Sequence, residues 1–249
     1  MKAMIFAAGL GERLRPITSR LPKALVPVAG RPMIDYPLAL LRHYGIRDIV
    51  INLHHLGEQI EAYLGNGAAQ GLSIVYSRED ELLDTGGGLL KAKPYLQDDR
   101  FVVINTDVLI DLPLAALVDF HQRNRAAATL AVRPDPFADQ FGSMEVDESG
   151  RIERFLQVHR PNAIPAAREK LMFTGVQILE PRIFDYMPPP DRQKKFGTTK
   201  DTYPRMLTSG EPLYGFRFDG YWQDLGTEQR VAAAEQSLAQ ATTRLHYLS

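Results

Sequence analysis

Residues 2–13 read Lys2-Ala3-Met4-Ile5-Phe6-Ala7-Ala8-Gly9-Leu10-Gly11-Glu12-Arg13. An apolar run over residues 3–8 leads directly into two glycines, which is typical of a first β-strand followed by a tight turn. In an open α/β sheet, ligands bind at the carboxyl ends of the strands, and the turn after the first strand is a common phosphate site. Glycines suit such a turn because backbone N–H groups can approach a phosphate where no Cβ intervenes. The stretch therefore predicts an α/β fold with an anion site at its first turn.

Two cations follow this turn and favour a triphosphate as its ligand. Arg13 ends the turn, and Lys23 lies between Pro22 and Pro27, which stiffen the backbone. A guanidinium can hold two phosphate oxygens, and a lysine ammonium supplies a compact point charge. Without these cations the glycines are a weak signal, because a bare Gly-x-Gly can be a tight turn with no ligand.

A dinucleotide site is a poorer interpretation of the same turn. That site requires a third glycine that opens a helix and an acidic residue at the end of the second strand. Leu14 occupies the third glycine position, and Pro16 would soon interrupt a helix. The second apolar run ends in Asn52-Leu53-His54 rather than in an acidic residue. We therefore do not expect a nicotinamide dehydrogenase.

The remaining pattern predicts a sheet wrapped by helices. Short apolar runs alternate with amphipathic stretches through the first half of the chain, as in parallel sheets with crossover helices. A turn at Glu148-Ser149-Gly150 between two apolar runs predicts a hairpin, and a proline-rich polar stretch over residues 188–197 predicts a mobile surface loop. The expected strands are residues 2–8, 48–53, 72–77, 101–105, 128–133, 144–146, 152–156, 173–179 and 213–218, and the expected helices are residues 33–44, 57–64, 87–96, 113–125 and 228–241.

Composition narrows the class of protein. The chain has 249 residues, 45% of them hydrophobic and 24% charged, which predicts one globular domain. A formal net charge of −1 argues against a long nucleic acid partner. The absence of cysteine excludes disulfides, thiolate metal sites and cysteine nucleophiles, and it fits a reducing compartment such as the cytoplasm. No apolar run is long enough for a membrane helix, so we expect no membrane association.

Two aspartates are candidate ligands for a metal. Asp107 closely follows the apolar run 101–105, so a strand delivers it to the carboxyl edge of the sheet, and Asp224 lies in a short aromatic segment. Transfer onto a triphosphate usually requires a divalent ion, and Mg²⁺ prefers one or two carboxylates together with phosphate oxygens and water. Either aspartate could instead cap a helix or form a turn.

Three runs of the sequence resemble the signature of the sugar-nucleotide pyrophosphorylases. They are Ile5-Phe6-Ala7-Ala8-Gly9-Leu10-Gly11-Glu12-Arg13-Leu14-Arg15-Pro16-Ile17-Thr18, then Pro22-Lys23, then Val26-Pro27-Val28-Ala29-Gly30-Arg31-Pro32-Met33-Ile34. Within this superfamily the chain is most similar to the N-acetylmuramic acid 1-phosphate uridylyltransferases, chiefly through Asp84-Thr85-Gly86-Gly87-Gly88 and the short length. Mannose 1-phosphate guanylyltransferases are the next most similar.

The resemblance implies a fold, an activity and a set of site residues. The fold is α/β, a Rossmann-like doubly wound mixed sheet with helices on both faces, of the glycosyltransferase-A-like nucleotidyltransferase type. We expect a single domain, with a nucleotide-binding part over residues 1–135 and a sugar-binding and closing part over residues 136–249. The implied reaction joins a nucleoside triphosphate to a sugar 1-phosphate with Mg²⁺. The implied residues are Arg13 and Lys23 for catalysis; Ala7, Ala8, Gly9, Gly11, Asp84 and Gly86 for the nucleotide; Gly142, Glu153, Thr174 and Gly175 for the sugar; and Asp107 and Asp224 for the metal.

Two departures from the family pattern leave alternatives open. Thr106 replaces the common glycine before Asp107, and Glu153-Arg154-Phe155 stands where many relatives have Glu-Lys-Pro. Arg154 or the Lys194-Lys195 pair could then contact the sugar phosphate. UTP with an N-acetylmuramic acid 1-phosphate-like sugar is the expected substrate pair, with GTP and mannose 1-phosphate as the alternative. A non-catalytic module that binds nucleotide sugars is the alternative of another class, and a monomer or small homo-oligomer is expected.

Overall fold

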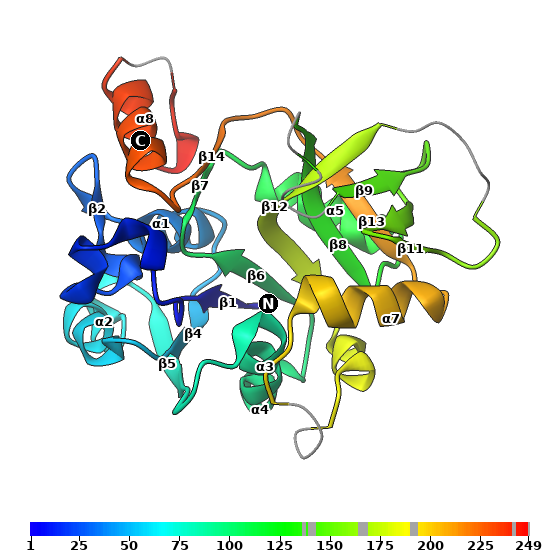
Figure 1. The fold of residues 1–249 in the computed structure, drawn as a ribbon, viewed down its shortest axis with the longest axis horizontal. Helices are drawn as coiled ribbons and strands as arrows, with labels where there is room; N and C mark the ends of the chain where they lie inside the picture. The colour runs from blue at the N-terminus through cyan, green and yellow to red at the C-terminus, as the bar shows by residue number, and fades with distance from the viewer. Residues whose placement is uncertain (136–137, 139–142, 164–168, 190–193, 241–242, 249) are drawn as a thin grey trace. The chain divides into compact units, whose positions relative to one another are not determined.

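The computed structural model describes residues 1–135, 138, 143–163, 169–189, 194–240 and 243–248 (Figure 1). Two compact units are formed by segments that alternate along the chain. Unit 1 comprises Met1–Leu82, Ile104–Leu112 and Gly220–Ser249, and unit 2 comprises Leu83–Val103 and Pro113–Asp219. Strand β6 (Phe101–Asn105) is divided between them, with its last two residues in unit 1.

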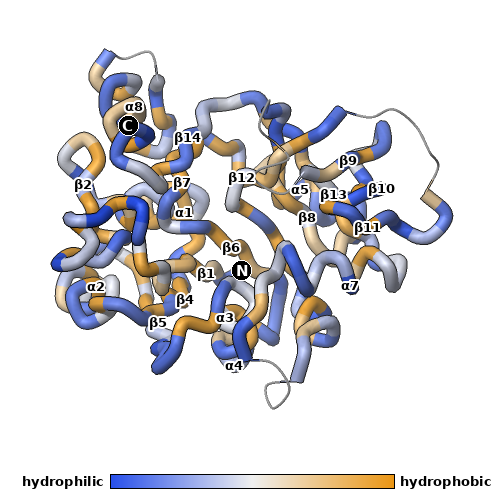
Figure 2. The backbone as a smooth tube through the Cα atoms, viewed as in Figure 1, coloured by the Kyte–Doolittle hydropathy of each residue, from blue (hydrophilic) through white to orange (hydrophobic). Residues whose placement is uncertain are grey.

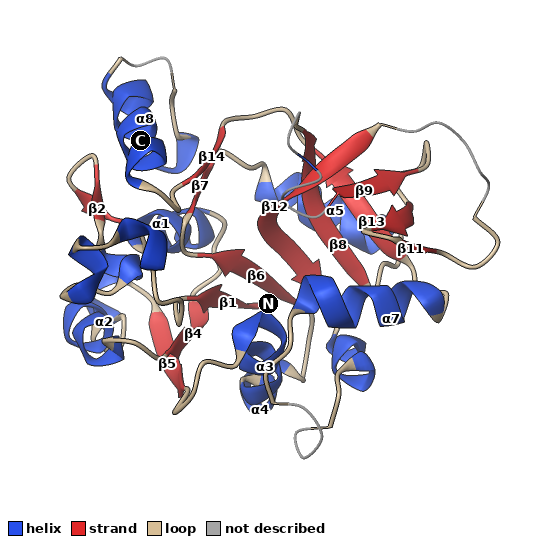
Figure 3. Ribbon diagram, viewed as in Figure 1, coloured by secondary structure: helices blue, strands red, loops and turns tan. Residues whose placement is uncertain are grey.

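Unit 1 is built on three parallel strands in the order β1-β4-β5 (Figure 3). These are β1 (Lys2–Phe6), β4 (Asp48–Leu53) and β5 (Ser73–Arg78), and the helices α1 (Asp35–His43) and α2 (Gly57–Leu64) connect them. Parallel strands are buried on both faces, so they read as continuous apolar runs rather than as alternating ones. Figure 2 accordingly shows hydrophobic residues along β1, β4 and β6.

Two short antiparallel pairs complete unit 1. Strand β2 (Pro27–Val28) pairs with β3 (Arg31–Pro32), and β7 (Val108–Ile110) pairs with β14 (Trp222–Asp224). The helix α8 (Glu228–Ala239) follows β14, and its N-cap Thr227 accepts a hydrogen bond from the Arg230 N–H at 3.3 Å. The β7–β14 pair thus brings a late segment of the chain beside the segment that follows β6.

Unit 2 contains a mixed sheet. The strands β11 (Val158–His159), β10 (Ile152–Phe155), β9 (Ser143–Val146) and β12 (Lys170–Leu179) pair antiparallel in that order. Strand β12 also pairs antiparallel with β8 (Ala128–Pro134), and β8 pairs in parallel with β13 (Leu213–Arg217). The helices are α3 (Asp84–Lys91), α4 (Lys93–Leu96), α5 (Leu114–Arg123) and α7 (Tyr203–Thr208).

Most of the predicted elements are confirmed. The expected bounds of β4, β6 and α2 are those observed, and the predicted hairpin is β9–β10. The single helix expected over residues 87–96 is wrong, because α3 begins three residues earlier and ends before α4. Strands β2, β3, β7, β11 and β14 and helix α7 were not predicted. The loop expected over residues 188–197 lies partly outside the described residues.

Among the helices that the structure describes, none has both the length and the apolar composition needed to cross a membrane.

The packing of α1 leads to a prediction about stability. Leu41 is 0% exposed in the core of unit 1, whereas its neighbour Arg42 is exposed. We expect Leu41→Ala to lower the free energy of unfolding by about 2–5 kcal/mol, because it leaves a cavity. Arg42→Ala should change it by less than about 1 kcal/mol. Urea unfolding curves measure both values, and equal losses in the two variants would contradict the burial of this helix face.

Candidate active site

The turn after β1 has a conformation that requires glycine at one position. Gly11 has φ +65°, and a Cβ there would lie 2.8 Å from Cγ2 of Thr18. The Thr18 hydroxyl donates to the Gly11 carbonyl at 2.8 Å, so this side chain is held against the turn. A Cβ at Gly9 would meet nothing within 4 Å. Gly11 therefore serves packing, while Gly9 leaves open space beside the backbone.

A buried polar chain fixes the end of β1. The Ala7 N–H donates to Oδ1 of Asn52 at 2.8 Å, and Nδ2 of Asn52 donates to Oε1 of Glu79 at 2.7 Å. Asn52 and Glu79 are 3% and 5% exposed. Sequence reasoning missed both residues, although a polar residue near the end of a buried apolar run was a usable signal. The Ala7 N–H is thus already used by the protein.

The β7–β14 pair brings the two candidate metal ligands together. Asp224 is opposite Val108 in the register, and the Leu225 N–H donates to the Asp107 carbonyl at 2.8 Å. The side chains of Asp107 and Asp224 are 21% and 16% exposed. The Thr106 hydroxyl donates to the Phe6 carbonyl, which gives this departure from the family pattern a role in holding the strand end. Asp107 and Asp224 are therefore neighbours.

Each of these carboxylates is paired with a cation of unit 1. Nζ of Lys23 bonds to Oδ2 of Asp107, and Nη1 of Arg230 bonds to Oδ1 of Asp224. Arg230 was not predicted, and its position on the first turn of α8 after the Thr227 cap is the signal that could have suggested it. The result is two adjacent ion pairs, Lys23–Asp107 and Arg230–Asp224.

The predicted arginine of the turn lies beside the second pair. A Cβ at Gly226 would lie 2.5 Å from Nη2 of Arg13 and 2.9 Å from Oδ1 of Asp224. The Gly226 N–H also donates to this carboxylate oxygen at 3.0 Å. The Arg13 guanidinium therefore lies against the backbone at Gly226, where only glycine leaves it room.

Asp107 and Asp224 suit a metal ion that takes its remaining ligands from outside the protein. Within the described part of the chain, no cluster of three or more acidic or histidine side chains could hold a metal ion. Mg²⁺ usually takes one or two carboxylates and completes its shell with water and phosphate oxygens. Two adjacent aspartates suit such an ion, and they do not form a cage made of protein ligands alone.

The first turn of α3 holds the predicted base-contacting residues in a packed environment. The N–H groups of Gly86 and Gly87 donate to the Phe196 carbonyl at 2.9 and 3.1 Å. A Cβ at either glycine would collide with residues 194–196. Asp84 has φ +62°, a strained conformation for a residue with a side chain. These glycines therefore permit close packing, and the Gly86 N–H is engaged within the protein in this conformation.

The predicted sugar contacts lie on β10 and β12 of unit 2. Glu153 is 2% exposed, and its Oε1 accepts from Nε of Arg160 at 3.0 Å. Oε2 of Glu153 is buried and has no hydrogen-bond partner among the described residues. The Thr174 hydroxyl donates to the Ala131 carbonyl at 2.8 Å, and Gly175 has φ +88° where the register of β12 with β8 shifts. The fourth predicted residue, Gly142, lies outside the described residues.

Arg154 is not a free cation. Its Nε and Nη2 donate to Oε1 of Glu145 at 2.9 and 2.7 Å, and its side chain is 13% exposed. Arg154 was one of the two alternatives for a contact with the sugar phosphate. Its guanidinium is instead paired with a glutamate of the neighbouring strand β9.

Comparison with known proteins supports one family. A family profile described as nucleotidyl transferase matches residues 2–241. The chain is 36% identical to a UTP–glucose-1-phosphate uridylyltransferase of Synechocystis and 34% identical to a mannose-1-phosphate guanylyltransferase of Mycobacterium tuberculosis, each over 91% of this chain. It spans only 60% and 61% of the length of those two proteins. It is also 37% identical to an N-acetylmuramate alpha-1-phosphate uridylyltransferase of Neisseria meningitidis, over 97% of this chain and 99% of that one.

Solved structures confirm the predicted fold class. A protein of Bacillus anthracis described as a glucose-1-phosphate thymidylyltransferase has a TM-score of 0.80 at 24% identity, covering 95% of this chain and 94% of that one. HddC of Yersinia pseudotuberculosis has a TM-score of 0.74 at 20% identity, covering 95% of this chain and 99% of that one. At these identities the likeness is one of fold.

The two glycines of the first turn generate a matched prediction. We expect Gly11→Ala to lower the free energy of unfolding by about 1–3 kcal/mol, because the new Cβ meets Thr18 in a left-handed backbone. Gly9→Ala should leave it within about 1 kcal/mol of the parent value, since its Cβ meets open space. Urea unfolding of both variants is the measurement. A Gly9→Ala loss as large as that of Gly11→Ala would contradict the geometry of the turn.

Proposed function

This chain belongs to the nucleotidyl transferase family, and on that premise we propose that it condenses a nucleoside triphosphate with a sugar 1-phosphate. The products are a nucleoside diphosphate sugar and pyrophosphate. The observation that carries the proposal is the adjacency of Asp107 and Asp224, each paired with a cation, in the unit that also holds the glycine turn.

The reaction is an in-line displacement at the α-phosphorus. An oxygen of the sugar 1-phosphate forms a new P–O bond there, the bond between the α-phosphorus and the bridging oxygen breaks, and the electron pair leaves with pyrophosphate. The attacking oxygen is already anionic at neutral pH, so a general base contributes little. Catalysis then rests on alignment and on neutralisation of charge. Lys23 is our candidate for the α-phosphate and Arg13 for the departing β- and γ-phosphates.

Asp107 and Asp224 are our candidates to hold Mg²⁺. The ion would neutralise charge on the triphosphate and on the leaving pyrophosphate. In the free protein these carboxylates are neutralised by Lys23 and Arg230. The anionic phosphates can replace the carboxylates as partners of the two cations, and the metal ion can replace the cations as partner of the carboxylates. Both ion pairs can therefore open when the triphosphate and its metal bind.

The nucleotide and sugar contacts remain proposals drawn from the family pattern. Ala7, Ala8, Gly9, Gly11, Asp84 and Gly86 are the candidates for the nucleotide, and Gly142, Glu153, Thr174 and Gly175 are those for the sugar. The buried, unpartnered Oε2 of Glu153 supports one of these assignments, because a carboxylate oxygen accepts hydrogen bonds from sugar hydroxyls. The Gly86 N–H could contact a base only if it gave up its bond to Phe196.

UTP and N-acetylmuramic acid 1-phosphate are the proposed substrates. The Neisseria relative with this specificity in its name aligns over nearly the whole of both chains. The guanylyltransferase relatives favour GTP and mannose 1-phosphate as the second candidate pair. Release of pyrophosphate, measured with UTP, GTP, ATP and dTTP against N-acetylmuramic acid, glucose and mannose 1-phosphates, separates these pairs. Tight nucleotide binding without turnover across the panel would overturn the enzymatic proposal in favour of a binding module.

Removing the charges at the centre of the site should abolish most of the activity. We expect Lys23→Ala and Asp107→Asn each to lower kcat by about 100-fold or more, since each removes a charge contact that is strongest in the transition state. Lys91→Ala, which removes an exposed lysine of α3, is the control for loss of a positive charge. Steady-state pyrophosphate release is the measurement. Near-normal kcat in Lys23→Ala would exclude the role proposed for that residue.

Gly226 allows a test of the position of the Arg13 guanidinium without replacing the arginine. Gly226→Ala puts a methyl group 2.5 Å from the present position of Nη2 of Arg13 and 2.9 Å from Oδ1 of Asp224, so the flexible arginine must move and the carboxylate must shift by a few tenths of an ångström. We expect a fall in kcat of about 10-fold or more with a change in the free energy of unfolding below about 1 kcal/mol. Unchanged kcat in a folded Gly226→Ala protein would show that the observed position of Arg13 does not matter for turnover.

A further inference from the structure

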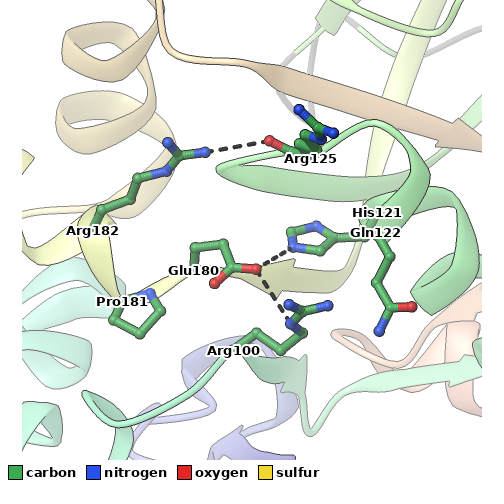
Figure 4. A pocket seen from close by; sticks show the side chains of 8 residues that line it. Arg100, His121, Gln122, Arg125, Glu180, Pro181 and Arg182 are labelled. Atoms are coloured by element: carbon green, nitrogen blue, oxygen red, sulfur yellow. Dashed lines mark hydrogen bonds and ion pairs between the residues drawn. The ribbon is translucent and has the colours of Figure 1, made fainter.

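A cavity of about 700 Å³ in unit 2 has a lining rich in arginine (Figure 4). Arg100, Arg125 and Arg182 line it together with His121, Gln122 and Glu180. None of these residues is among those assigned to nucleotidyl transfer above. We propose that this cavity binds a phosphate dianion, either as free phosphate or as the monoester of a small metabolite.

A hydrogen-bonded chain holds one wall of the cavity. Oε1 of Glu180 lies 3.3 Å from Nε of Arg100 and 3.2 Å from Nε2 of His121 (Figure 4). His121 is 1% exposed, and its Nδ1 lies 2.9 Å from the hydroxyl of Thr129, which is 0% exposed. The ion pair with Glu180 therefore ties Arg100 to a wall whose other members, His121 and Thr129, are buried.

The lining carries an excess of positive charge. Burial lowers the pKa of His121 from its usual value, so this residue is neutral at pH 7. Three guanidinium groups then face one carboxylate within the lining, on a chain whose formal net charge is −1. Two carboxylates outside the lining offset part of this charge, since Glu211 lies 3.4 Å from Nε of Arg182 and Asp99 lies 4.0 Å from Nε of Arg100. Arg125 is therefore the arginine of the lining that has no acidic partner among the described residues.

Arg125 occupies a backbone position that favours glycine. It follows the C-cap Asn124 of α5 and has φ +46°. This left-handed position after a helix is usually glycine, because a Cβ is disfavoured there. Attraction to the negative end of the helix dipole does not explain why an arginine stands at position 125, since His121 and Arg123 already lie in the last turn of α5. A strained residue at a cavity is an indication of function.

The guanidinium of Arg125 is available to a ligand. Among the described residues it forms no ion pair, and its side chain is exposed at the cavity. Nη2 of Arg182 lies 3.4 Å from the Arg125 carbonyl, so Arg182 covers the carbonyl that would otherwise repel an anion (Figure 4).

The geometry of the donors favours phosphate over a simple halide or a monocarboxylate. Each guanidinium is a planar fork that can donate two parallel hydrogen bonds to an oxyanion. The fork of Arg125, the remaining Nη1 of Arg182 and the amide of Gln122 offer more donors than one carboxylate has oxygens to accept in a single plane. A tetrahedral dianion can use forks that come from different directions. A cavity of this volume also leaves room for the organic part of a phosphate ester.

Isothermal titration calorimetry at constant ionic strength tests the proposal. Inorganic phosphate and glucose 6-phosphate are the probes, and glucose is the neutral control. We expect Arg125→Gly to weaken the binding of at least one probe by about 10-fold, which corresponds to one lost charge-assisted contact. Arg123→Gln removes the same charge from an exposed position of α5 outside the lining and should leave binding unchanged.

Stability separates loss of a ligand contact from loss of the fold. Arg125→Gly relieves the left-handed strain, so its Tm should rise, by up to about 2–4 °C. Arg125→Gln keeps the strain and should lose the same affinity without that rise. Lys23→Ala serves to identify phosphate bound at the active site, and it should retain the binding component that Arg125→Gly removes.

Each outcome of the titrations either assigns the ligand of the cavity or overturns the proposal. Binding of phosphate alone assigns the cavity to the free ion, and binding of glucose 6-phosphate as well assigns it to monoesters. Identical isotherms for the parent protein and Arg125→Gly would overturn the proposal. An equal loss in Arg123→Gln would also overturn it, because the effect would then be one of general charge.

Discussion

The antiparallel pairing of β7 with β14 is the constraint on which the candidate active site depends. It places Asp224 opposite Val108 and ties Leu225 to the carbonyl of Asp107, so the two candidate metal ligands become neighbours along the strand pair. A charge in a partly buried position is costly when it is unpaired. Lys23 and Arg230 remove that cost by pairing with one carboxylate each. The partly buried carboxylates beside the strand pair are therefore neutralised within the protein itself.

Close backbone packing is the second theme of the site. Gly11 leaves room for Thr18, Gly226 leaves room for Arg13, and Gly86 lets the Phe196 segment approach α3. In each case another part of the protein occupies the space that a Cβ atom would take. A glycine-rich motif near a phosphate site thus has two functions, because it exposes backbone donors at some positions and allows side chains to pack at others. Gly9 has open space beside it, as the role proposed for it in phosphate binding requires.

Sequence periodicity predicted the elements that are defined locally. Strands β4 and β6 and helix α2 have the expected bounds because the apolar run or amphipathic pattern that defines each of them lies within a single continuous segment of the chain. Strand β14 is only three residues long and is specified by a distant partner, so no local pattern could reveal it. Arg230 pairs with Asp224 of this strand, so its role was hidden as well, although its place on the first turn of α8 was a usable local signal. The residue types at Asp107 and Asp224 were recognisable, whereas their adjacency is a product of the fold.

Burial explains why two charged residues of β10, Glu153 and Arg154, differ in their surroundings from what the sequence suggests. A glutamate on a strand is usually solvated, yet Glu153 is 2% exposed and its charge is met by Arg160 on one oxygen alone. Arg154, next to it, points its fork at Glu145. The register of β10 with β9 shifts between Ile152 and Arg154, which is where Glu153 lies. Glu153 is a buried acceptor with a spare lone pair, whereas Arg154 is engaged in a structural ion pair. The departure from the usual Glu-Lys-Pro pattern therefore leaves the glutamate available and the neighbouring cation committed.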